Sequence, residues 1–384
     1  MRKPVFIGLV AAFLLWSWMF LTVRYNYGGH WTALYFIGPN VPQTPPVAAE
    51  HPYLWYGTPG YDGQVFHVMA HDPWMRYGPP ENFELRPFRY VRILVPALAW
   101  LLAFGRDAWI DPSYYFVIVA FTFLGAYWAA RWALRNGLSA LWGFAFLATP
   151  AAITSADRML CDVALAALCA GFVVYAEEGS RAKIFIVLAC AALVRETGAI
   201  LPLGFAAYSL LRRRWANLAL ACAALVPLAG WELYVRAHSL TSAAPPPVLG
   251  WIPFEGFLHR TSYIFPYTLS PALRTIAIAF DYVALAAVAV AVAMVIRLAA
   301  RLEWTPQISA LYGFALAAIF LRGQGEWAEV YSFGRLLTPL LLLTGLVYLP
   351  RIGWLAFAPM FVVGLRVTVW LARQVAGILH ALLS

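Results

Sequence analysis

Residues 4–23 read PVFIGLVAAFLLWSWMFLTV, a stretch that carries no charged side chain. A helix of about 20 apolar residues is long enough to cross the roughly 30 Å hydrocarbon core of a bilayer. Arg2 and Lys3 precede the stretch, and Arg24-Tyr25-Asn26-Tyr27 follows it in place of a small-x-small cleavage site. We therefore expect an uncleaved membrane anchor whose N-terminus lies in the cytoplasm.

The composition of the whole chain extends this expectation. Of its 384 residues 62% are hydrophobic and only 12% are charged, whereas soluble domains carry about 25% charged residues. The formal net charge is +9, but the basic residues form short clusters between apolar runs, as the loop charges of membrane proteins do. We therefore predict membrane lipids, and no nucleic acid, as partners. The cysteines lie in apolar runs without paired spacing, which is typical of small buried side chains: Cys161, Cys169, Cys190 and Cys222.

Charges and turn residues divide the chain into eleven apolar segments, which predict an all-α, polytopic integral membrane protein. The predicted spans are 4–23, 112–131, 137–154, 160–176, 183–195, 198–211, 215–233, 274–296, 304–321, 334–350 and 352–372. Between the first two lies residues 24–111, a stretch rich in Pro, Gly, Tyr, His and charge. We expect this long loop to lie outside the cytoplasm.

The orientation follows from arginines in short loops, which favour the cytoplasmic side. The loops 131–135, 212–214 and 297–301 all fall inside if two conditions hold. Segment 93–104 must not cross; a helix of that length is about 18 Å long, so we expect an interfacial helix. Segment 183–211 must be two short spans that meet at Arg195-Glu196-Thr197. The acidic residues then gather at the outer face, apart from Glu177, Glu178 and Glu303 inside and Asp281 within its span.

Asp62 is the first candidate for chemistry. It follows the Pro59-Gly60 turn and precedes an apolar-periodic run, so it is either a helix N-cap or a carboxylate placed to act as a general base. His67 and His71 share a helix face and Asp72 adjoins them, but a metal site there lacks a clear third ligand. For these three residues the favoured interpretation is interfacial polar side chains.

Three further polar groups fall at outer turns. Asp157-Arg158 and Asp162 either open a helix or bind a metal or a sugar, and Asp162 stands at an apolar edge where an unpaired charge is costly. Arg195-Glu196 is either a mutually neutralising pair or contains an arginine that meets a lipid phosphate. The stretch 327–335 ends in Arg335, which opens an apolar helix and needs an anionic partner.

Several short blocks in this order resemble a known family. They are Tyr-Asp-Gly-Gln-Val-Phe at 61–66, Ala-His-Asp-Pro at 70–73, Arg-Tyr-Val-Arg-Ile-Leu-Val-Pro at 89–96, Leu-Val-Arg-Glu-Thr-Gly at 193–198 and the run 331–339. Together they resemble bacterial membrane glycosyltransferases of the GT-C superfamily, in particular proteins linked to cell-surface glycopolymer formation. Such enzymes transfer a sugar from a polyprenyl-phosphate donor to a lipid or glycan acceptor outside the cytoplasm.

The resemblance implies roles for particular residues. Asp62 matches the catalytic aspartate of the first outer loop. The expected donor-binding residues are Arg195, Glu196, Tyr331 and Arg335, and the expected substrate-binding residues are Tyr61, Gln64, Asp157, Arg158 and Asp162. Oligosaccharyltransferases of this class bind a metal through an Asp-x-Asp pattern in the second outer loop. Asp157 and Asp162 occupy the comparable place with a different spacing. A divalent metal is therefore one possible cofactor, and no residue is assigned as its ligand.

The resemblance also implies an organisation. A GT-C-like catalytic module covers 1–236 and contains the first periplasmic loop, 24–111. A C-terminal membrane module covers 237–384, with outer loops at 237–273 and 322–334. The expected location is the bacterial inner membrane, with the active site facing the periplasm.

Three other classes compete with a glycosyltransferase. A transporter or flippase of a lipid-linked glycan would place ionisable groups near the midplane, where only Asp281 qualifies. An O-acyltransferase would need a histidine inside the membrane, whereas all seven histidines lie in or near loops or near the C-terminus. A non-catalytic assembly subunit is the third alternative.

Overall fold

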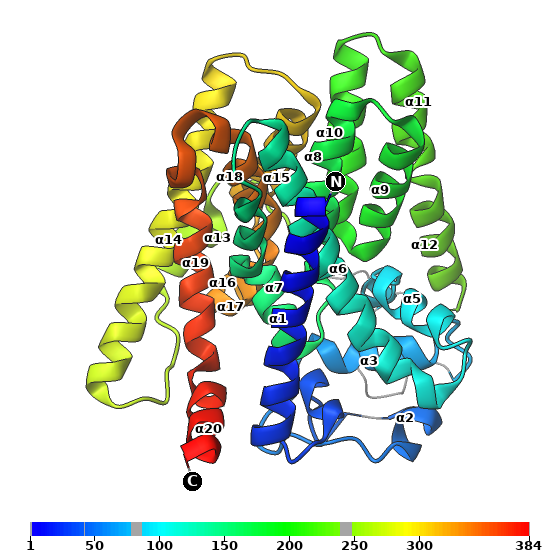
Figure 1. Cartoon of the computed structure of the whole chain (residues 1–384), viewed down its shortest axis with the longest axis vertical. Coiled ribbons are helices and arrows are strands. Elements are labelled where there is room, and N and C mark those ends of the chain that lie inside the picture. The colour runs from blue at the N-terminus through cyan, green and yellow to red at the C-terminus, as the bar shows by residue number, and fades with distance from the viewer. Residues whose placement is uncertain (1, 42, 78–86, 239–247, 384) are drawn as a thin grey trace.

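The computed structural model describes residues 2–41, 43–77, 87–238 and 248–383. Within these ranges the chain is helical and contains no strand, only two isolated bridges, which confirms the predicted all-α class (Figure 1). The first elements are α1 (Arg2–Asn26), η1 (Trp31–Tyr35), α2 (Pro45–Ala49), α3 (Asp62–His71), α4 (Pro87–Tyr90), α5 (Leu94–Leu102) and α6 (Asp107–Arg135). Then follow η2 (Ala140–Ala148), α7 (Pro150–Arg158), α8 (Asp162–Glu178), α9 (Arg181–Val194), η3 (Glu196–Ala199), α10 (Ile200–Leu211), α11 (Trp215–Ala223) and α12 (Val226–His238). The last are α13 (Glu255–Ser262), α14 (Pro271–Ala300), α15 (Pro306–Phe320), α16 (Gln324–Trp327), α17 (Val330–Leu336), α18 (Thr338–Ile352), η4 (Gly353–Phe357), α19 (Ala358–Thr368), η5 (Val369–Leu371) and α20 (Ala372–Leu383).

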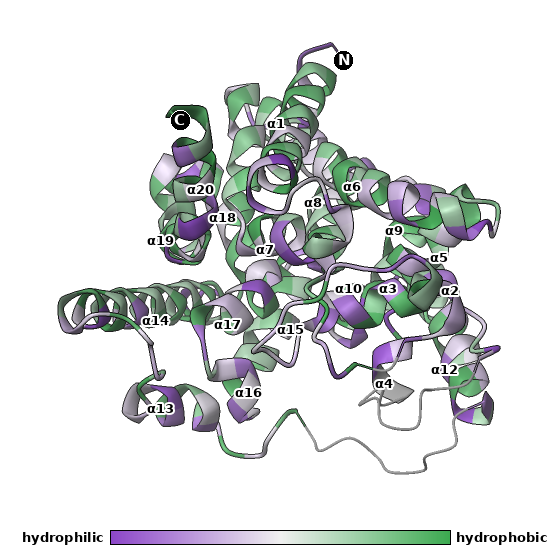
Figure 2. Ribbon diagram, turned by 90° about the horizontal axis from the view of Figure 1, so that it is seen from below, coloured by the Kyte–Doolittle hydropathy of each residue, from purple (hydrophilic) through white to green (hydrophobic). Residues whose placement is uncertain are grey.

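Five helical stretches among the described residues are long and apolar enough to cross a membrane, as expected of a multi-pass membrane protein. They are Arg2–Asn26, Asp107–Arg135, Trp215–His238, Pro271–Ala300 and Thr338–Leu383. Figure 2 shows hydrophobic residues along most of these helices. The apolar stretches Glu196–Leu211 and Pro306–Phe320 are shorter.

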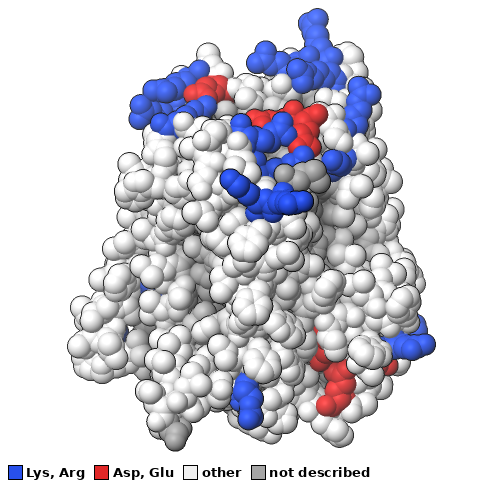
Figure 3. Space-filling view, in the orientation of Figure 1, with Lys and Arg blue, Asp and Glu red and all other residues white. Residues whose placement is uncertain are grey.

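The helices alternate between two ends of the bundle. The turns that follow α6, α8, α10 and α14 form what we call the basic end, which carries Arg135, Lys183, Arg213 and Arg301. The opposite, loop end carries α2, α3 and the C-terminus (Figure 1). Figure 3 shows most basic residues of the visible face gathered at the basic end, above a broad band with almost no charge, and fewer charged residues at the opposite end. This distribution is that of a protein whose middle faces lipid.

Several predicted spans are interrupted in the structure. Segment 137–154 was expected as one span, but it is a 3₁₀ helix, η2, followed by α7, with Thr149 capping α7 and Pro150 at its first position. Similarly, 334–350 is divided between α17 and α18 at Leu337, two residues before Pro339. Proline lacks an amide hydrogen and disfavours helical backbone in the preceding residue, so it ends helices locally while hydropathy continues.

The expected break within 183–211 is present. Helix α9 ends at Val194, and Arg195 has an extended backbone (φ −169°, ψ 165°) before the short η3. Gly198 lies so close to α9 that a Cβ atom would stand 1.7 Å from the carbonyl oxygen of Ala191. The break therefore turns the Arg195 and Glu196 side chains out of helical register at the loop end.

Helix α8 forms the centre of the bundle. Residues 162–174 are all buried, and α8 packs against α6, α7, α9 and α18. Its alanines and Gly171 let neighbouring helices approach closely, as small residues do in membrane helix bundles. The first residue of this central helix is Asp162, at the loop end.

The described parts of the long loop, 24–41, 43–77 and 87–111, are folded against the loop end. Segment 93–104 contains the predicted short helix, α5, which packs against α3 and α6. Helix α3 packs against the end of α7, where a Cβ atom on Gly63 would lie 2.2 Å from the carbonyl oxygen of Arg158. Glycine at this position brings the start of α3 next to the start of α8.

Candidate functional site

A cavity of about 720 Å³ opens at the loop end. One part of its wall is polar and comes from α3, the segment before α5, η3, α16 and α17: Asp62, Arg89, Arg92, Arg195, Glu196, Thr197, Glu326, Ser332 and Arg335. The other part is apolar and comes mainly from α15, α17 and α18: Ile200, Val248, Leu249, Phe314, Ala317, Ala318, Leu321, Leu336, Leu337 and Leu340. The cavity thus joins a charged region to an apolar surface.

Asp62 stands in the polar wall, as the first residue of α3. Of the two interpretations of the sequence, the N-cap is wrong, because Tyr61 holds that position and makes no side-chain cap bond. The Asp62 carboxylate instead receives a hydrogen bond from Arg335 Nη2 at 2.7 Å and lies 3.3 Å from Arg89 Nη1 and 3.8 Å from Arg92 Nη1. Burial opposes its ionisation, but these arginines outweigh burial and hold the pKa of Asp62 well below its usual value.

Asp162 connects the two arginines that were predicted to bind a phosphate. Arg195 Nη1 donates to one oxygen of Asp162, and Arg335 Nη1 donates to the other at 3.2 Å. Asp162 is 3% exposed, so this link lies beneath the cavity. The two arginines therefore converge on one buried carboxylate. Their Nε atoms are buried and have no hydrogen-bond partner among the described residues.

Glu196 is bound mainly by an arginine from the long loop. Arg92 donates from Nε at 2.9 Å and from Nη2 at 2.7 Å to the two oxygens of Glu196, whereas Arg195 lies 3.5 Å away. Neither Arg89 nor Arg92 was predicted as a site residue from the sequence. Their spacing of three residues, which places both on one side of a helical turn, is the signal that could have identified them.

The expected residues Asp157, Arg158 and Tyr331 form a separate group. Asp157 accepts hydrogen bonds from Tyr331, Arg158 and Gln374, each at 3.0 Å. The Arg158 guanidinium lies 3.5 Å from the centre of the Phe36 ring. None of these side chains lines the cavity. They tie α7 to α17, α20 and the long loop.

Tyr61 and Gln64 flank the site in different ways. The Tyr61 hydroxyl is 3.2 Å from Ser332 Oγ, which lines the cavity, and the Arg335 guanidinium lies 5.0 Å from the Tyr61 ring centre. Gln64 accepts a hydrogen bond from the Gly38 amide at 3.0 Å and donates to the Pro59 carbonyl at 3.2 Å. Its amide therefore holds the loop that leads into α3.

The histidines of α3 lie in a second polar cluster, remote from Asp62 along the helix. No third metal ligand could be identified from the sequence, but the structure places Glu50 and Asp111 beside His67 and His71. Burial lowers the pKa of His71, but the neighbouring carboxylates outweigh burial and raise it to about 10. Asp72 is not part of this cluster; it accepts a hydrogen bond from the Tyr77 amide at 2.9 Å in the turn after α3.

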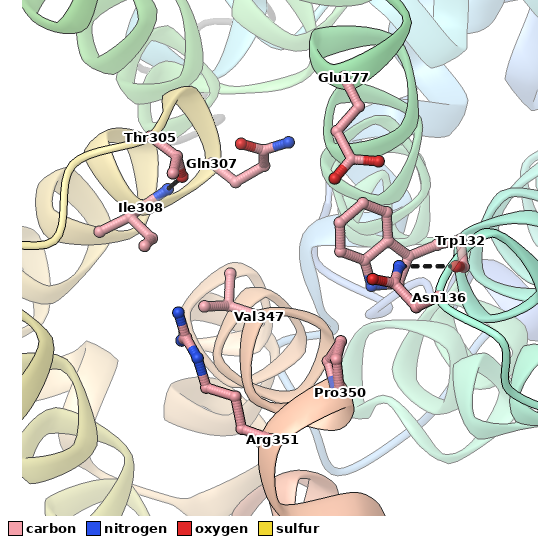
Figure 4. Close-up of a pocket in the computed structure, with 9 residues that line it drawn as sticks. All are labelled: Trp132, Asn136, Glu177, Thr305, Gln307, Ile308, Val347, Pro350 and Arg351. Carbon is pink, nitrogen blue, oxygen red and sulfur yellow. Dashed lines mark hydrogen bonds between the residues drawn. The ribbon is translucent and has the colours of Figure 1, made fainter.

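A smaller cavity of about 240 Å³ lies at the basic end (Figure 4). Its polar groups already have partners within the protein: Trp132 Nε1 donates to the Leu346 carbonyl, and Asn136 donates to the Trp132 carbonyl. Arg351 projects from the wall opposite Glu177 and pairs with Glu303. This cavity offers no convergent set of groups comparable to the one at the loop end.

Comparison of the chain with protein-family models, curated proteins and solved structures found no match. The functional argument therefore rests on the cavity itself.

Proposed function

We propose that the chain is a GT-C-type glycosyltransferase of the bacterial inner membrane. It transfers a sugar from a polyprenyl-phosphate donor to a lipid or glycan acceptor in the periplasm. The observation that carries the proposal is the Asp62 carboxylate, which lies among arginines in a cavity whose other wall is apolar.

The two walls suit the two parts of the donor. A polyprenyl phosphate has an apolar tail that partitions into the bilayer and an anionic headgroup at its surface. Arg89, Arg92, Arg195 and Arg335 line the polar wall, and guanidinium groups bind phosphate oxygens through paired hydrogen bonds. The apolar wall of α15 and α18 is formed by the kind of side chains that an isoprenoid contacts.

The charges around Asp62 would also let donor binding change the pKa of this carboxylate. With Arg335 bound to it, Asp62 is a weak base, because its pKa is held low. A phosphate that takes hydrogen bonds from Arg335 and Arg89 reduces their hold on the carboxylate and raises its pKa. Asp62 then becomes a stronger base only in the complex that has a sugar to transfer.

The proposed reaction is a direct substitution at the anomeric carbon. The acceptor oxygen forms a bond to that carbon while its proton passes to Asp62, and the bond from the carbon to the phosphate oxygen breaks. General-base assistance of this kind contributes about 10²–10⁴-fold in rate. The electron pair leaves with the lipid phosphate, whose charge the arginines stabilise.

We also propose the membrane arrangement that the sequence predicts, with eleven crossings and the loop end in the periplasm. The alternation of helices between the two ends supports it (Figure 1). The arginines and the lysine of the basic end would then face the cytoplasm, as the positive-inside rule requires. Leu101, Leu102 and Phe104 at the end of α5 are exposed, as expected of a helix that rests at the membrane surface.

The test is Asp62→Asn in the full chain, assayed in membranes with a panel of polyprenyl-phosphate-linked sugars. Asparagine keeps the size of the side chain but cannot accept the proton, so we expect normal insertion and a loss of transfer of at least about 100-fold. Glu232→Gln is the control, because Glu232 is a partly exposed carboxylate outside the cavity that pairs with Arg236 one helical turn away. Near-wild-type transfer by a well-expressed Asp62→Asn protein would refute the proposed mechanism.

The structure weakens the transporter alternative. Asp281, its candidate midplane charge, accepts hydrogen bonds from Arg260 and Arg366 at 2.8 Å and from Tyr267 at 2.7 Å. A buried carboxylate with three hydrogen-bond donors, two of them buried arginines, is poorly placed to exchange protons or ions. If the panel shows lipid movement without sugar transfer, the flippase function replaces the one proposed.

A further inference from the structure

Four side chains from distant parts of the chain meet behind α3. They are Glu50 at the end of α2, His67 and His71 on one face of α3, and Asp111 in the second turn of α6. One ligand atom from each lies within 4.8 Å of all the others. The set contains two imidazole nitrogens and two carboxylate oxygens.

The individual distances match a common centre. His67 Nε2 lies 3.1 Å from Glu50 Oε2 and 3.0 Å from Asp111 Oδ1. His71 Nε2 lies 3.1 Å from Glu50 Oε1 and 3.9 Å from Asp111 Oδ1. Tetrahedral Zn²⁺ with bonds of about 2.0–2.2 Å places its ligand atoms about 3.3–3.5 Å apart. These four distances, which involve both oxygens of Glu50, differ from that spacing by a few tenths of an ångström.

The groups around the cluster orient its members. Nδ1 of His71 lies 3.0 Å from Asp107 Oδ1, an arrangement that places the proton on Nδ1 and leaves Nε2 to face Glu50 and Asp111. The hydroxyl of Tyr35 donates to Asp111 at 2.9 Å and that of Tyr115 at 3.3 Å. Carboxylates and hydroxyls that hold the ligands in this way are typical of metal sites.

Two buried histidine nitrogens of the cluster, His67 Nδ1 and His71 Nε2, have no hydrogen-bond partner among the described residues, and His71 Nε2 is the one that faces the carboxylates. His71 is 2% exposed, and Glu50 Oε1 lies 3.1 Å from its Nε2. The contact is close but not aligned for an N–H···O bond. A buried nitrogen in that state is satisfied by a cation placed between it and the carboxylates.

We propose that Glu50, His67, His71 and Asp111 bind one divalent transition-metal ion, with Zn²⁺ as the first candidate. Nitrogen and oxygen ligands without a thiolate suit Zn²⁺ and its neighbours, and a closed set of four protein ligands is typical of structural sites. The Glu50 and Asp111 side chains are 21% and 15% exposed, which gives the ion a path from the aqueous side.

The ion would join the long loop to the membrane helix α6. It would hold the C-terminal half of α3 to α2 and to the beginning of α6. Asp62 is the first residue of α3. From Asp62 to His67 the helix rises about 7.5 Å, so the ion is not a reactant in the cavity. It fixes the helix that presents Asp62, and this inference does not depend on what reaction occurs there.

The competing explanation is an ion-pair cluster in which both histidines are protonated. The two carboxylates and Asp107 make the region negative, and such a region attracts either protons or a metal ion. The experiment must therefore separate these two cations.

The test uses the full chain purified in detergent without a histidine tag, exposed to Zn²⁺, desalted and analysed by mass spectrometry for metals. We expect about one Zn²⁺ per chain, and a loss to background in the His67→Gln/His71→Gln double variant. His259→Gln is the matched control, because His259 lies in α13 outside the cluster. Removal of the ion by a chelator should lower the melting temperature of the wild type, and Zn²⁺ should restore it.

A second measurement tests the proposal if the double variant fails to fold. Co²⁺ in the wild-type site should show the visible absorption of a tetrahedral ion, and His67→Cys should add a sulfur-to-cobalt charge-transfer band. Less than a tenth of an equivalent of Zn²⁺, equal Zn²⁺ in the double variant, or His67→Cys protein without that band would overturn the proposal. If the purified protein contains no metal and a chelator leaves its melting temperature unchanged, the four side chains form the ion-pair cluster instead. Neither readout measures sugar transfer, so failure here leaves the proposed function intact.

Discussion

Asp162 and Asp62 share Arg335 but differ in what surrounds them. Asp162 is enclosed at the start of the central helix α8 and joins Arg195 to Arg335. Asp62 borders the cavity. The arginines beside it also pair with other carboxylates, Arg335 with Asp162 and Arg92 with Glu196. Removing Asp162 takes a carboxylate from two buried arginines at once and leaves Arg195 with only Glu196, 3.5 Å away, whereas removing Asp62 leaves Arg335 bound to the buried Asp162.

We expect Asp162→Asn to destabilise the protein by about 3–5 kcal/mol, the usual cost of removing one partner from a buried ion pair. Asp62→Asn should change stability much less. Thermal unfolding of the two variants in detergent, side by side with the wild type, measures the difference. Equal melting temperatures for Asp162→Asn and the wild type would mean that Asp162 does not hold the arginines together.

At the scale of elements, the position of α3 is set by contact with the backbone of α7. Gly63 is the second residue of α3, and any Cβ there would meet the Arg158 carbonyl oxygen at 2.2 Å and that of Tyr35 at 2.7 Å. Backbone atoms cannot rotate away as a side chain can. A larger residue must therefore push α3, and Asp62 with it, away from α7.

We accordingly expect Gly63→Ala to lower the melting temperature and to reduce sugar transfer strongly. Gly230→Ala is the control, because a Cβ there meets nothing within 4 Å, and alanine inside a helix is favoured over glycine by about 0.5–1 kcal/mol. Unfolding curves and transfer assays on both proteins provide the comparison. A Gly63→Ala protein as stable and active as Gly230→Ala would show that α3 tolerates displacement.

At the scale of the whole molecule, charge separates the two ends of the bundle. Arg135 pairs with Glu178 at 2.6 Å in the basic end, while the cavity and the histidine cluster lie at the other. The proposed orientation puts these two ends on opposite sides of the membrane. Single cysteines at exposed positions can report it.

Trp251→Cys at the loop end and Arg213→Cys at the basic end form the matched pair, in a background with Cys222→Ser because Cys222 is exposed. Trp251 is 96% exposed. We expect a membrane-impermeant thiol reagent to label Trp251→Cys in intact cells, and Arg213→Cys only after the membrane is opened. Labelling of both in intact cells, or the reverse pattern, would contradict the orientation.

The apolar runs of the sequence determined the helical class, because hydropathy is a local property. The arginines of the short loops predicted the break at Arg195, because they fix the side on which each loop lies. Local sequence patterns also identified Asp162 and Arg335 as charged residues in apolar surroundings that require partners, and Asp62 as a residue at the start of a helix. These patterns divided the chain less accurately where proline interrupts a run, as at Pro150 and Pro339.

Only the tertiary structure decided which residues meet. Arg92 pairs with Glu196 across 104 positions of the chain, and Asp62 meets Arg335 across 273. Hydropathy and spacing describe neighbours along a helix and carry no information about such distant pairs. The histidines of α3 had no third ligand in the sequence for the same reason: the folding of α2 and α6 against α3 brings in Glu50 and Asp111.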